Sequence, residues 1–277
     1  MGFLMFRLRT SILNALGIHS DNTSSVPNLV TKRFLELLGI NSSSRVFRAF
    51  KLFYRRTGAH IRIPHSFSFN GEDLILAKYL PELSGSYLDI GSGNPTLGSN
   101  TFLFYSRGWS GISIDPLQRS HRRHQRRRER DHQILGAVIG SAGDVSKITF
   151  YEYAADDFST TSESRYLELL EQGNKPSNIR DSKVIDLNQL DLITGPLEPY
   201  LLDIDIEGGE FSVLESINWA VFSPRVIAVE EWISPIYNPT NVRLLLEENG
   251  YELTSRAVIT SIYVHRSYLK QMVNPEE

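Results

Sequence analysis

The sequence predicts an α/β protein with a doubly wound, mostly parallel sheet that carries helices on both faces. Three stretches lead to this expectation, because each joins an apolar strand to a glycine turn or to an acidic strand end. They are SYLDIGSGNP (residues 86–95), GISIDP (residues 111–116) and LLDIDIEGGEF (residues 201–211). Ligands of such sheets bind at the carboxyl ends of the strands, which is where these glycines and acids fall.

Composition limits the chemistry that is available to the chain. The 277 residues include no cysteine, which excludes disulfides, thiolate metal sites and a thiol nucleophile. The sequence has no apolar run of the length that spans a bilayer, about 18 residues or more. We therefore expect a cytoplasmic protein without a membrane-spanning helix.

Charge is unevenly distributed along the chain. Residues 1–63 contain ten basic and two acidic residues, whereas the rest contains 19 basic and 30 acidic residues. Apolar residues recur at helical spacing within 29–38 and 46–54. We predict a basic helical N-terminal extension at 1–63 and a main domain at 64–277. The extension could contact a membrane surface or a polyanion, or it could be a solvated helical appendage.

The first half of the main domain alternates strands and helices. Glu72 and Asp73 fall in a first helical turn, where the helix dipole favours carboxylates, and Gly108 follows another helix, as glycine commonly does. The polar stretch 154–182 predicts a long irregular insertion of the kind that forms lids or substrate loops. The expected helices lie within 67–83 and at 99–107, 118–132 and 166–170, and the expected strands at 86–90, 111–114, 134–140, 148–153 and 184–187.

The second half continues the alternation and ends in a strand pair. Gly208-Gly209 turns the chain into a helix that carries Phe211 to Ile217, and Asn249-Gly250 stops a second helix. Together with the first half, this order predicts an open sheet that closes with two neighbouring strands. The expected strands lie at 201–206, 226–229, 251–255 and 257–265, and the second helix lies at 241–248.

The stretch QRSHRRHQRRRERDH, residues 118–132, has seven arginines and three histidines. Such a run could contact nucleic-acid phosphates. It contains no aromatic residue, however, so the stacking platform used for single strands is missing. We expect a solvated basic face of a helix, and nucleic acid is not expected as a partner.

Acidic residues gather after two of the predicted strands. Asp203, Asp205 and Glu207 alternate with apolar residues, so on an extended chain they share one face. Three carboxylates would repel one another in a core, and we therefore expect them at a strand end that faces a cleft. Glu230 ends the next strand. Asp205, Glu207 and Glu230 are the candidate catalytic acids.

The ordered series SFNGEDLIL, YLDIGSGNP, SNTFLFYSRGWSGISIDP, LLDIDIEGGEFSVL and VIAVEE resembles the FkbM-type S-adenosylmethionine-dependent methyltransferases. The resemblance covers roughly residues 66–265 and leaves residues 1–63 outside. It implies a seven-stranded, Rossmann-like class I methyltransferase sheet whose last strand is antiparallel. It also implies S-adenosylmethionine as cofactor and an acceptor hydroxyl on a sugar, glycan or glycosylated metabolite.

The resemblance gives roles to particular residues. Asp89 and the turn Gly91, Ser92 and Gly93 should line the methionine and ribose portion, and Asp115 should accept from the ribose hydroxyls. The family's GED element places Glu72 near the methionine end, and Ser99 and Asn100 open the helix beside the turn. The family usually has glutamine where this chain has Phe69, so any contact of that glutamine is lost. The implied cofactor-binding residues are Glu72, Asp89, Gly91, Ser92, Gly93, Ser99, Asn100 and Asp115.

Methyl transfer from a sulfonium is an in-line displacement, so the enzyme mainly aligns acceptor and methyl group. A hydroxyl is a poor nucleophile, and a general base or a metal should assist it. The three candidate acids could supply either, because carboxylate oxygens suit Mg²⁺ and neighbouring carboxylates can also share a proton.

Two other classes of function stay open from the sequence. The glycine turn and Asp115 alone would suit a nucleotide-binding dehydrogenase, although a full GxGxxG is missing after the first strand. The alternative to an enzyme is a binding module that docks on a membrane or polyanion through the basic extension.

Overall fold

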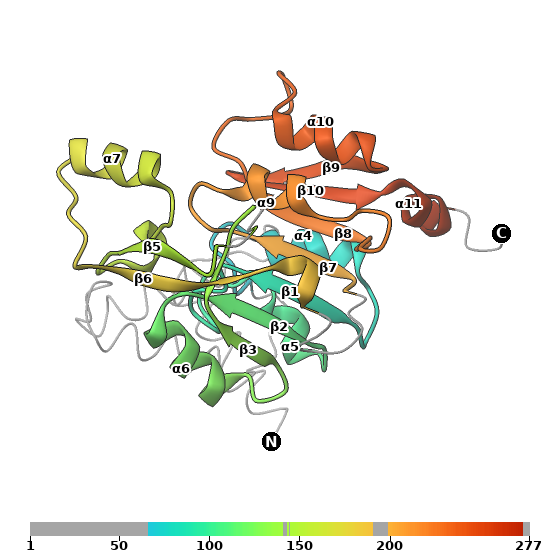
Figure 1. Cartoon of the computed structure of the whole chain (residues 1–277). Helices are drawn as coiled ribbons and strands as arrows, with labels where there is room; N and C mark the ends of the chain where they lie inside the picture. Colours follow the sequence, from blue (N-terminus) through green and yellow to red (C-terminus); the bar gives the residue numbers. More distant parts are fainter. Residues whose placement is uncertain (1–65, 141–142, 144, 191–198, 274–277) are drawn as a thin grey trace, which may run out of the picture. The chain divides into compact units, whose positions relative to one another are not determined.

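The computed structural model describes residues 66–140, 143, 145–190 and 199–273 (Figure 1). The chain divides into two compact units after His65. The predicted extension at 1–63 lies outside the described residues, and so does any membrane contact that it makes. Within the described residues, no helix is long and apolar enough to cross a membrane.

A seven-stranded sheet forms the centre of the described domain (Figure 1). Its strands lie in the order β3-β2-β1-β7-β8-β10-β9. The first five are parallel, and β10 runs antiparallel to both of its neighbours. This order confirms the predicted class I methyltransferase sheet with its reversed last strand. The bounds are β1 Ser86–Ile90, β2 Ser110–Asp115, β3 His132–Leu135, β7 Leu201–Ile204, β8 Val226–Glu230, β9 Tyr251–Ala257 and β10 Thr260–His265.

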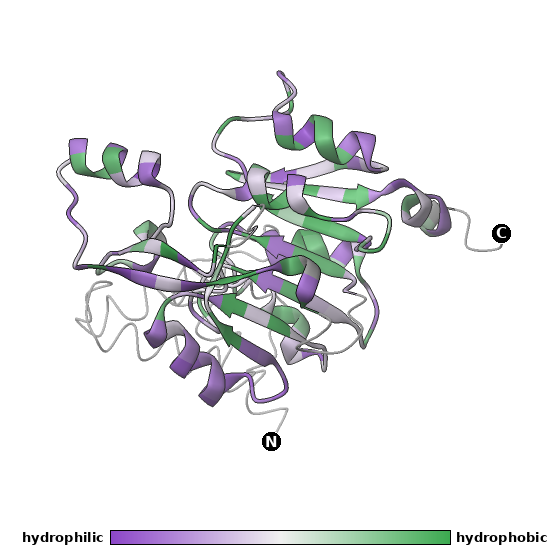
Figure 2. Cartoon of the chain, viewed as in Figure 1, coloured by the Kyte–Doolittle hydropathy of each residue, from purple (hydrophilic) through white to green (hydrophobic). Residues whose placement is uncertain are grey.

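Helices cover both faces of this sheet, as alternating strand residues require. Leu88 and Ile90 of β1 face one buried cluster, which includes α9 and α10 residues. Tyr87 faces a second cluster with α4 and α5 residues, so Asp89 is directed to that same side. Figure 2 shows green, apolar stretches along strands of the large sheet, whereas α6 is almost entirely hydrophilic. The helices are α4 Glu72–Tyr79, α5 Phe102–Ser106, α6 Gln118–Arg127, α9 Glu210–Ser216, α10 Asn241–Glu248 and α11 Arg266–Val273. The last of these had no counterpart in the sequence prediction.

The strand predicted at 134–140 is two strands in two different sheets. β3 belongs to the large sheet, whereas β4 (Ala137–Val138) belongs to a three-stranded sheet of order β4-β6-β5. The chain changes sheet at Gly136, where a Cβ would lie 2.6 Å from the Ile185 side chain. Only a residue without a side chain lets the chain pass this close to its neighbour. Because the chain leaves the large sheet at this residue, the prediction of a single strand at 134–140 was wrong.

The predicted irregular insertion is more ordered than expected. It contains the short helix η1 (Asp156–Phe158), the helix α7 (Glu163–Glu171) and the start of β6 (Asn178–Ile185). β6 pairs antiparallel with β5 (Lys147–Glu152) and parallel with β4. Most of the first half of β6 is exposed on both faces. Its residues therefore lack the alternation that identifies a strand.

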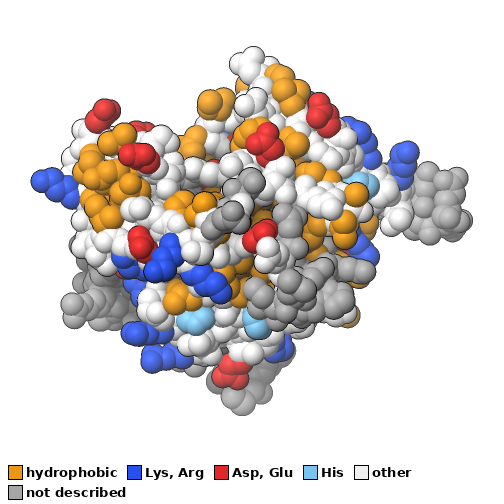
Figure 3. All heavy atoms as spheres, viewed as in Figure 1, with side chains coloured by type: hydrophobic (Ala, Val, Ile, Leu, Met, Phe, Trp, Pro, Cys, Tyr) orange, Lys and Arg blue, Asp and Glu red, His pale blue; other side chains and the backbone are white. Residues whose placement is uncertain are grey.

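The arginine run is only partly a solvated face. Basic side chains gather over α6 (Figure 3), and Arg122, Arg123, Arg126 and Arg127 are exposed. Arg128, at the end of α6, is fully buried, and His124 is buried beside it. Burial and the Arg128 charge lower the pKa of His124 to about 3, so this imidazole is neutral. The prediction was therefore wrong for the face of α6 that packs on the sheet.

Candidate active site

The glycine turn after β1 joins the ends of three neighbouring strands. Gly91 has φ +82° and donates its N–H to the Ile114 carbonyl at 2.9 Å. A Cβ on Gly91 would lie 1.7 Å from the carbonyl oxygen of Asp205. Any side chain at this position would collide with the backbone that leaves β7. The turn therefore lies at the switch point between β1 and β7, where ligands bind in open α/β sheets.

A cavity of about 350 Å³ opens at these strand ends. One wall comes from the large sheet and the other from the small sheet and α7. The lining combines apolar side chains with several acids, and this combination suits a ligand with a flat apolar ring and a polar remainder. The described lining residues include Gly91, Gly93, Ile114, Asp115, Leu117, Val138, Phe150, Thr160, Arg165, Asp205, Glu207, Glu230 and Trp232.

Asp115 is fixed at the end of β2 by backbone donors. Its Oδ2 accepts from Gly93 N at 2.7 Å, and its Oδ1 accepts from Leu117 N at 2.6 Å. Burial raises the pKa of Asp115 to about 6, and the side chain lines the cavity with 6% of its residue surface exposed. Each oxygen keeps a further acceptor position, so an ionised Asp115 can accept from two neighbouring hydroxyls.

The three predicted catalytic acids meet in the same cavity. Carboxylate oxygens of Asp205, Glu207 and Glu230 lie within 4.8 Å of one another. Glu230 is 6% exposed. Burial, and then the negative charge of Glu207, raise the pKa of Glu230 to about 8. Among the described residues, the buried Oε2 of Glu230 has no hydrogen-bond partner.

Asp203 does not share the cleft with the other acids, which corrects the one-face prediction. β7 ends at Ile204, so the chain is no longer extended beyond it and the two-residue alternation stops. Asp203 pairs in register with Asp89, and its Oδ1 accepts from Asn100 Nδ2 at 3.0 Å. Burial and the neighbouring Asp89 raise the pKa of Asp203 well above its usual range.

Residues that the sequence did not reveal fix the loop that carries Glu207. Glu207 has φ +57°, a left-handed conformation that is uncommon for a residue with a side chain. Glu210 Oε1 accepts from Ile206 N at 3.2 Å and from Gly208 N at 3.0 Å. Thr160 Oγ1 donates to the Glu207 carbonyl at 2.9 Å. The loop is thus held both by its own helix start and by the insertion.

Arg165 of α7 brings a positive charge to the acids. Its Nη2 lies 3.6 Å from Glu207 Oε2, and its Nη1 donates to Glu168 at 2.8 Å. Its guanidinium carbon lies 5.2 Å from the Trp232 ring centroid. Among the described residues that line the cavity, Arg165 is the one basic residue. No local sequence pattern indicated this role, because α7 is far from the acids along the chain.

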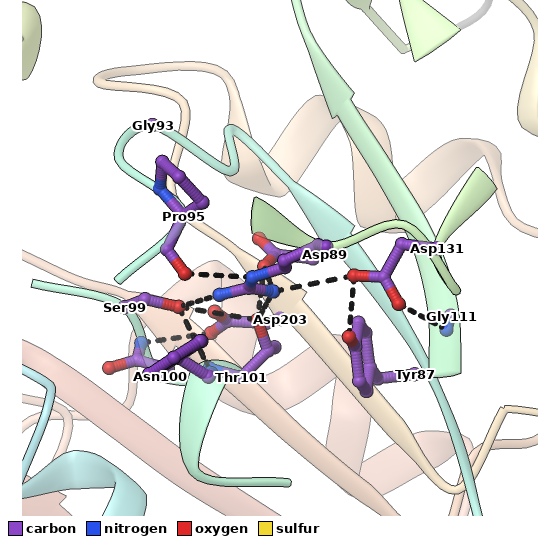
Figure 4. Close-up of polar contacts among 12 residues, drawn as sticks. Tyr87, Asp89, Gly93, Pro95, Ser99, Asn100, Thr101, Gly111, Asp131 and Asp203 are labelled. Atoms are coloured by element: carbon purple, nitrogen blue, oxygen red, sulfur yellow. Dashed lines mark hydrogen bonds and ion pairs between the residues drawn. The ribbon is translucent and has the colours of Figure 1, made fainter. Parts of the chain in front are cut away.

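Four of the predicted cofactor residues, Asp89, Ser92, Ser99 and Asn100, are not among the cavity-lining residues, although Ser92 belongs to the turn itself. Figure 4 shows Asp89, Ser99, Thr101 and Asp131 converging from β1, from the start of α5 and from the residue before β3. Thr101 donates to Asp89, and Ser99 Oγ accepts from Phe102 N at 3.1 Å. These residues shape the turn, and direct contact of their side chains with a cofactor stays a prediction.

Glu72 is buried at the start of α4 and shapes the neighbouring loop. Its carboxylate accepts from Asn70 N at 2.8 Å and from Asn70 Nδ2 at 2.9 Å. Asn70 and Phe69 line the cavity, whereas Glu72 is not among the lining residues. Its predicted place near the cofactor's methionine end therefore stays a prediction.

The strand order, the glycine turn and the acid at the end of β2 define a Rossmann-like protein of the S-adenosylmethionine-dependent methyltransferase class. A sequence model described as the methyltransferase FkbM domain matches residues 89–253, more than half of the chain. The chain belongs to the FkbM methyltransferase family.

Solved structures give further likenesses. The chain is similar to methyltransferase FkbM from Methylobacillus flagellatus KT, with 14% identity over 92% of this chain and 58% of that one and a TM-score of 0.39. It is also similar to a TehB-like SAM-dependent methyltransferase from Corynebacterium glutamicum, with 10% identity over 79% and 97% and a TM-score of 0.37. The comparison with curated proteins finds no match. The fold and family therefore rest on the strand order and the domain match.

Cofactor chemistry fits these residues. The apolar side chains beside Asp115, among them Ile114, Val138 and Phe150, suit an adenine ring. The carboxylate of Asp115 suits ribose hydroxyls. When bound, S-adenosylmethionine would supply the electrophilic methyl group. The family match argues against the dehydrogenase hypothesis, because the matching domain is described as a methyltransferase.

Proposed function

We propose that this protein is an S-adenosylmethionine-dependent O-methyltransferase that acts on a hydroxyl of a sugar, a glycan or a glycosylated metabolite. The observation that carries the proposal is the meeting of Asp205, Glu207 and Glu230 in the cavity that also holds Asp115. The cavity thus combines a site for a nucleoside with a group of carboxylates, and the carboxylates are the residues that could activate a hydroxyl.

The reaction needs one proton to be removed as the bond forms. The acceptor oxygen attacks the methyl carbon, the carbon–sulfur bond breaks with its electron pair going to sulfur, and the hydroxyl proton passes to a base. Glu230 is the proposed base. Its raised pKa makes its carboxylate a stronger proton acceptor than an ordinary glutamate. Asp205 and Glu207 would accept hydrogen bonds from neighbouring hydroxyls and orient the acceptor.

The rim of the cavity supports a ring-shaped acceptor. Trp232 lines the cavity and is 61% exposed, so part of its ring is accessible to a ligand. An aromatic ring offers a flat apolar surface beside polar groups. This combination suits a sugar, which has an apolar face and a periphery of hydroxyls.

The same acids fit a divalent cation. Three carboxylates are the oxygen ligands that Mg²⁺ prefers, and the buried Oε2 of Glu230 has an acceptor position to offer. Asp205, Glu207 and Glu230 would hold such an ion, which would polarise an acceptor hydroxyl. Arg165 already contributes one positive charge at Glu207 and would oppose the entry of a cation.

The test is methyl transfer from labelled S-adenosylmethionine to a panel of methyl glycosides, glycosylated metabolites, amines and phenols, with and without a chelator. We expect labelled product only from hydroxyl-bearing glycosides, and survival of the activity in chelator would exclude a required metal and leave proton removal to the carboxylates. Labelling of amines or phenols only would refute the acceptor class. Absence of cofactor binding by calorimetry, in folded protein, would refute the function as a whole.

A further inference from the structure

We infer that Arg128 is a positioning residue for the cofactor turn, acting through the segment 95–101 that follows the turn. The inference rests on the proposed function only in naming S-adenosylmethionine as the ligand. Arg128 itself is not among the residues that line the cavity, so its action is exerted through the residues that it holds.

The guanidinium of Arg128 makes three hydrogen bonds to one short segment of chain. Nε donates to the Pro95 carbonyl at 2.8 Å, Nη1 donates to Thr101 Oγ1 at 2.7 Å and Nη2 donates to Ser99 Oγ at 2.5 Å. The segment links the glycine turn to α5. A single rigid group therefore fixes both of its ends.

Two carboxylates make this buried cation tenable. Nη1 lies 3.6 Å from Asp89 Oδ2 and 3.6 Å from Asp131 Oδ2, and Arg128 is 0% exposed. A buried charge persists only when it is paired and hydrogen-bonded. Asp131 is held in turn by Tyr87 Oη, which donates to its Oδ2 at 2.6 Å, and by Gly111 N at 3.0 Å. The position of the Arg128 guanidinium is thus fixed, through Asp131, relative to β1 and β2 of the sheet.

The geometry requires arginine in particular. Three different nitrogens of one planar group reach three acceptors in fixed directions, whereas lysine offers one point of attachment on a flexible stem. A lysine at this position would keep the charge near Asp89 and lose most of the contacts to the segment. Arginine-to-lysine substitution therefore separates the positioning role from simple charge balance.

The segment acts directly on the turn that borders the cavity. Thr101, held by Arg128, donates to Asp89, which lies two residues before Gly91. The other end of the turn is fixed by Gly93 N on Asp115 and by Ser120 of α6, which donates to the Gly93 carbonyl. Release of the 95–101 segment would therefore leave the turn attached at Gly93 and loosened beside Asp89 and Pro95.

The experiment compares wild type, Arg128→Lys and the control Arg122→Lys, which changes an exposed arginine of α6. Each protein is titrated with S-adenosylhomocysteine by calorimetry, and amide hydrogen exchange is measured over residues 91–101. We expect Arg128→Lys to weaken binding about tenfold or more and to speed exchange in this segment. Arg122→Lys should match wild type.

Kinetics distinguish positioning from general destabilisation. With Arg128→Lys we expect the KM for S-adenosylmethionine to rise about tenfold, while kcat at saturating cofactor and the KM for the acceptor stay within about threefold of wild type. If Arg128→Lys does not fold, Ser99→Ala removes one acceptor and leaves the cation paired. It should weaken S-adenosylhomocysteine binding about threefold to tenfold.

The outcomes separate this inference from the function on which it rests. If Arg128→Lys folds with unchanged affinity and unchanged exchange, the positioning role is overturned while the methyltransferase assignment stays intact. If Arg128→Lys does not fold, unchanged affinity in Ser99→Ala has the same meaning. Failure of wild type to bind S-adenosylhomocysteine would overturn both. Equal loss of binding in Arg122→Lys would also overturn it, because the effect would then not depend on the contacts that Arg128 makes to the 95–101 segment.

Discussion

The glycine turn allows a matched pair of substitutions with very different expected costs. Gly91 and Gly93 both have positive φ, +82° and +48°. A Cβ on Gly91 would lie 1.7 Å from the Asp205 carbonyl oxygen, whereas a Cβ on Gly93 would meet only the Gly91 carbonyl at 3.8 Å. Backbone conformation alone should therefore penalise both changes, and steric overlap should penalise only Gly91→Ala.

The magnitudes follow from these two terms. A left-handed conformation costs a residue with a Cβ about 1 kcal/mol. Overlap with a backbone atom forces a shift of the chain and adds roughly 2 kcal/mol. We expect Gly93→Ala to lower the free energy of unfolding by about 1 kcal/mol and Gly91→Ala by about 3 kcal/mol.

Urea denaturation measures the difference directly. With a slope of roughly 2 kcal/mol per molar urea, the unfolding midpoint should fall by about 0.5 M in Gly93→Ala and by about 1.5 M in Gly91→Ala. Gly91→Ala should also abolish S-adenosylhomocysteine binding, because the turn must move away from β7. Equal midpoints for the two variants would refute the reasoning, since the contact between Gly91 and Asp205 would then impose no constraint.

Three further outcomes are expected. Glu230→Gln should lower kcat about 100-fold without changing the affinity for S-adenosylhomocysteine. Glu171→Gln, which changes an exposed glutamate of α7 outside the cavity lining, should leave both unchanged. A normal kcat in Glu230→Gln would exclude Glu230 as the base. The folded pKa of Asp115 is about 6, so its acceptor carboxylate is present above pH 6 and is lost as the pH falls through 6. The affinity of wild type for S-adenosylhomocysteine should therefore fall as the pH is lowered through 6. If Asp115→Asn shows the same fall in affinity, another group is responsible for it. Removal of residues 1–63, which carry ten basic and two acidic residues, should abolish binding to phosphatidylserine vesicles, and vesicle binding that survives the deletion would contradict a docking role.

Local sequence signals were sufficient for most strands of the large sheet. The apolar run before Gly91 and the repeat that ends in Asp115 predicted β1 and β2, because a buried strand and its turn are encoded by adjacent residues. The closing strands β9 and β10 were predicted for the same reason. The meeting of Asp205, Glu207 and Glu230 also followed from the sequence, since the carboxyl ends of neighbouring parallel strands lie at one edge of a sheet.

Contacts between distant segments were beyond the reach of the sequence. Arg128 lies in a run whose composition is that of a solvated helix, and its burial depends on Asp89, which is 39 positions earlier in the sequence. Arg165 and Thr160 reach the acids only because the small sheet places α7 beside the loop after β7. Asp203 was misplaced because β7 ends at Ile204, so the alternation that would put Asp203, Asp205 and Glu207 on one face does not continue beyond it.

The change of sheet at Gly136 has a consequence for how relatives of this protein can diversify. From this glycine to the end of β6, one piece of chain supplies Val138, Phe150, Thr160 and Arg165 to the lining of the cavity, and the last two of these contact Glu207. Exchange of this module between relatives would therefore change the apolar lining and the contacts to Glu207 together. A graft that aims to change only the contacts to Glu207 would keep β4 and β5 from the recipient and take the segment from η1 through α7 from the donor.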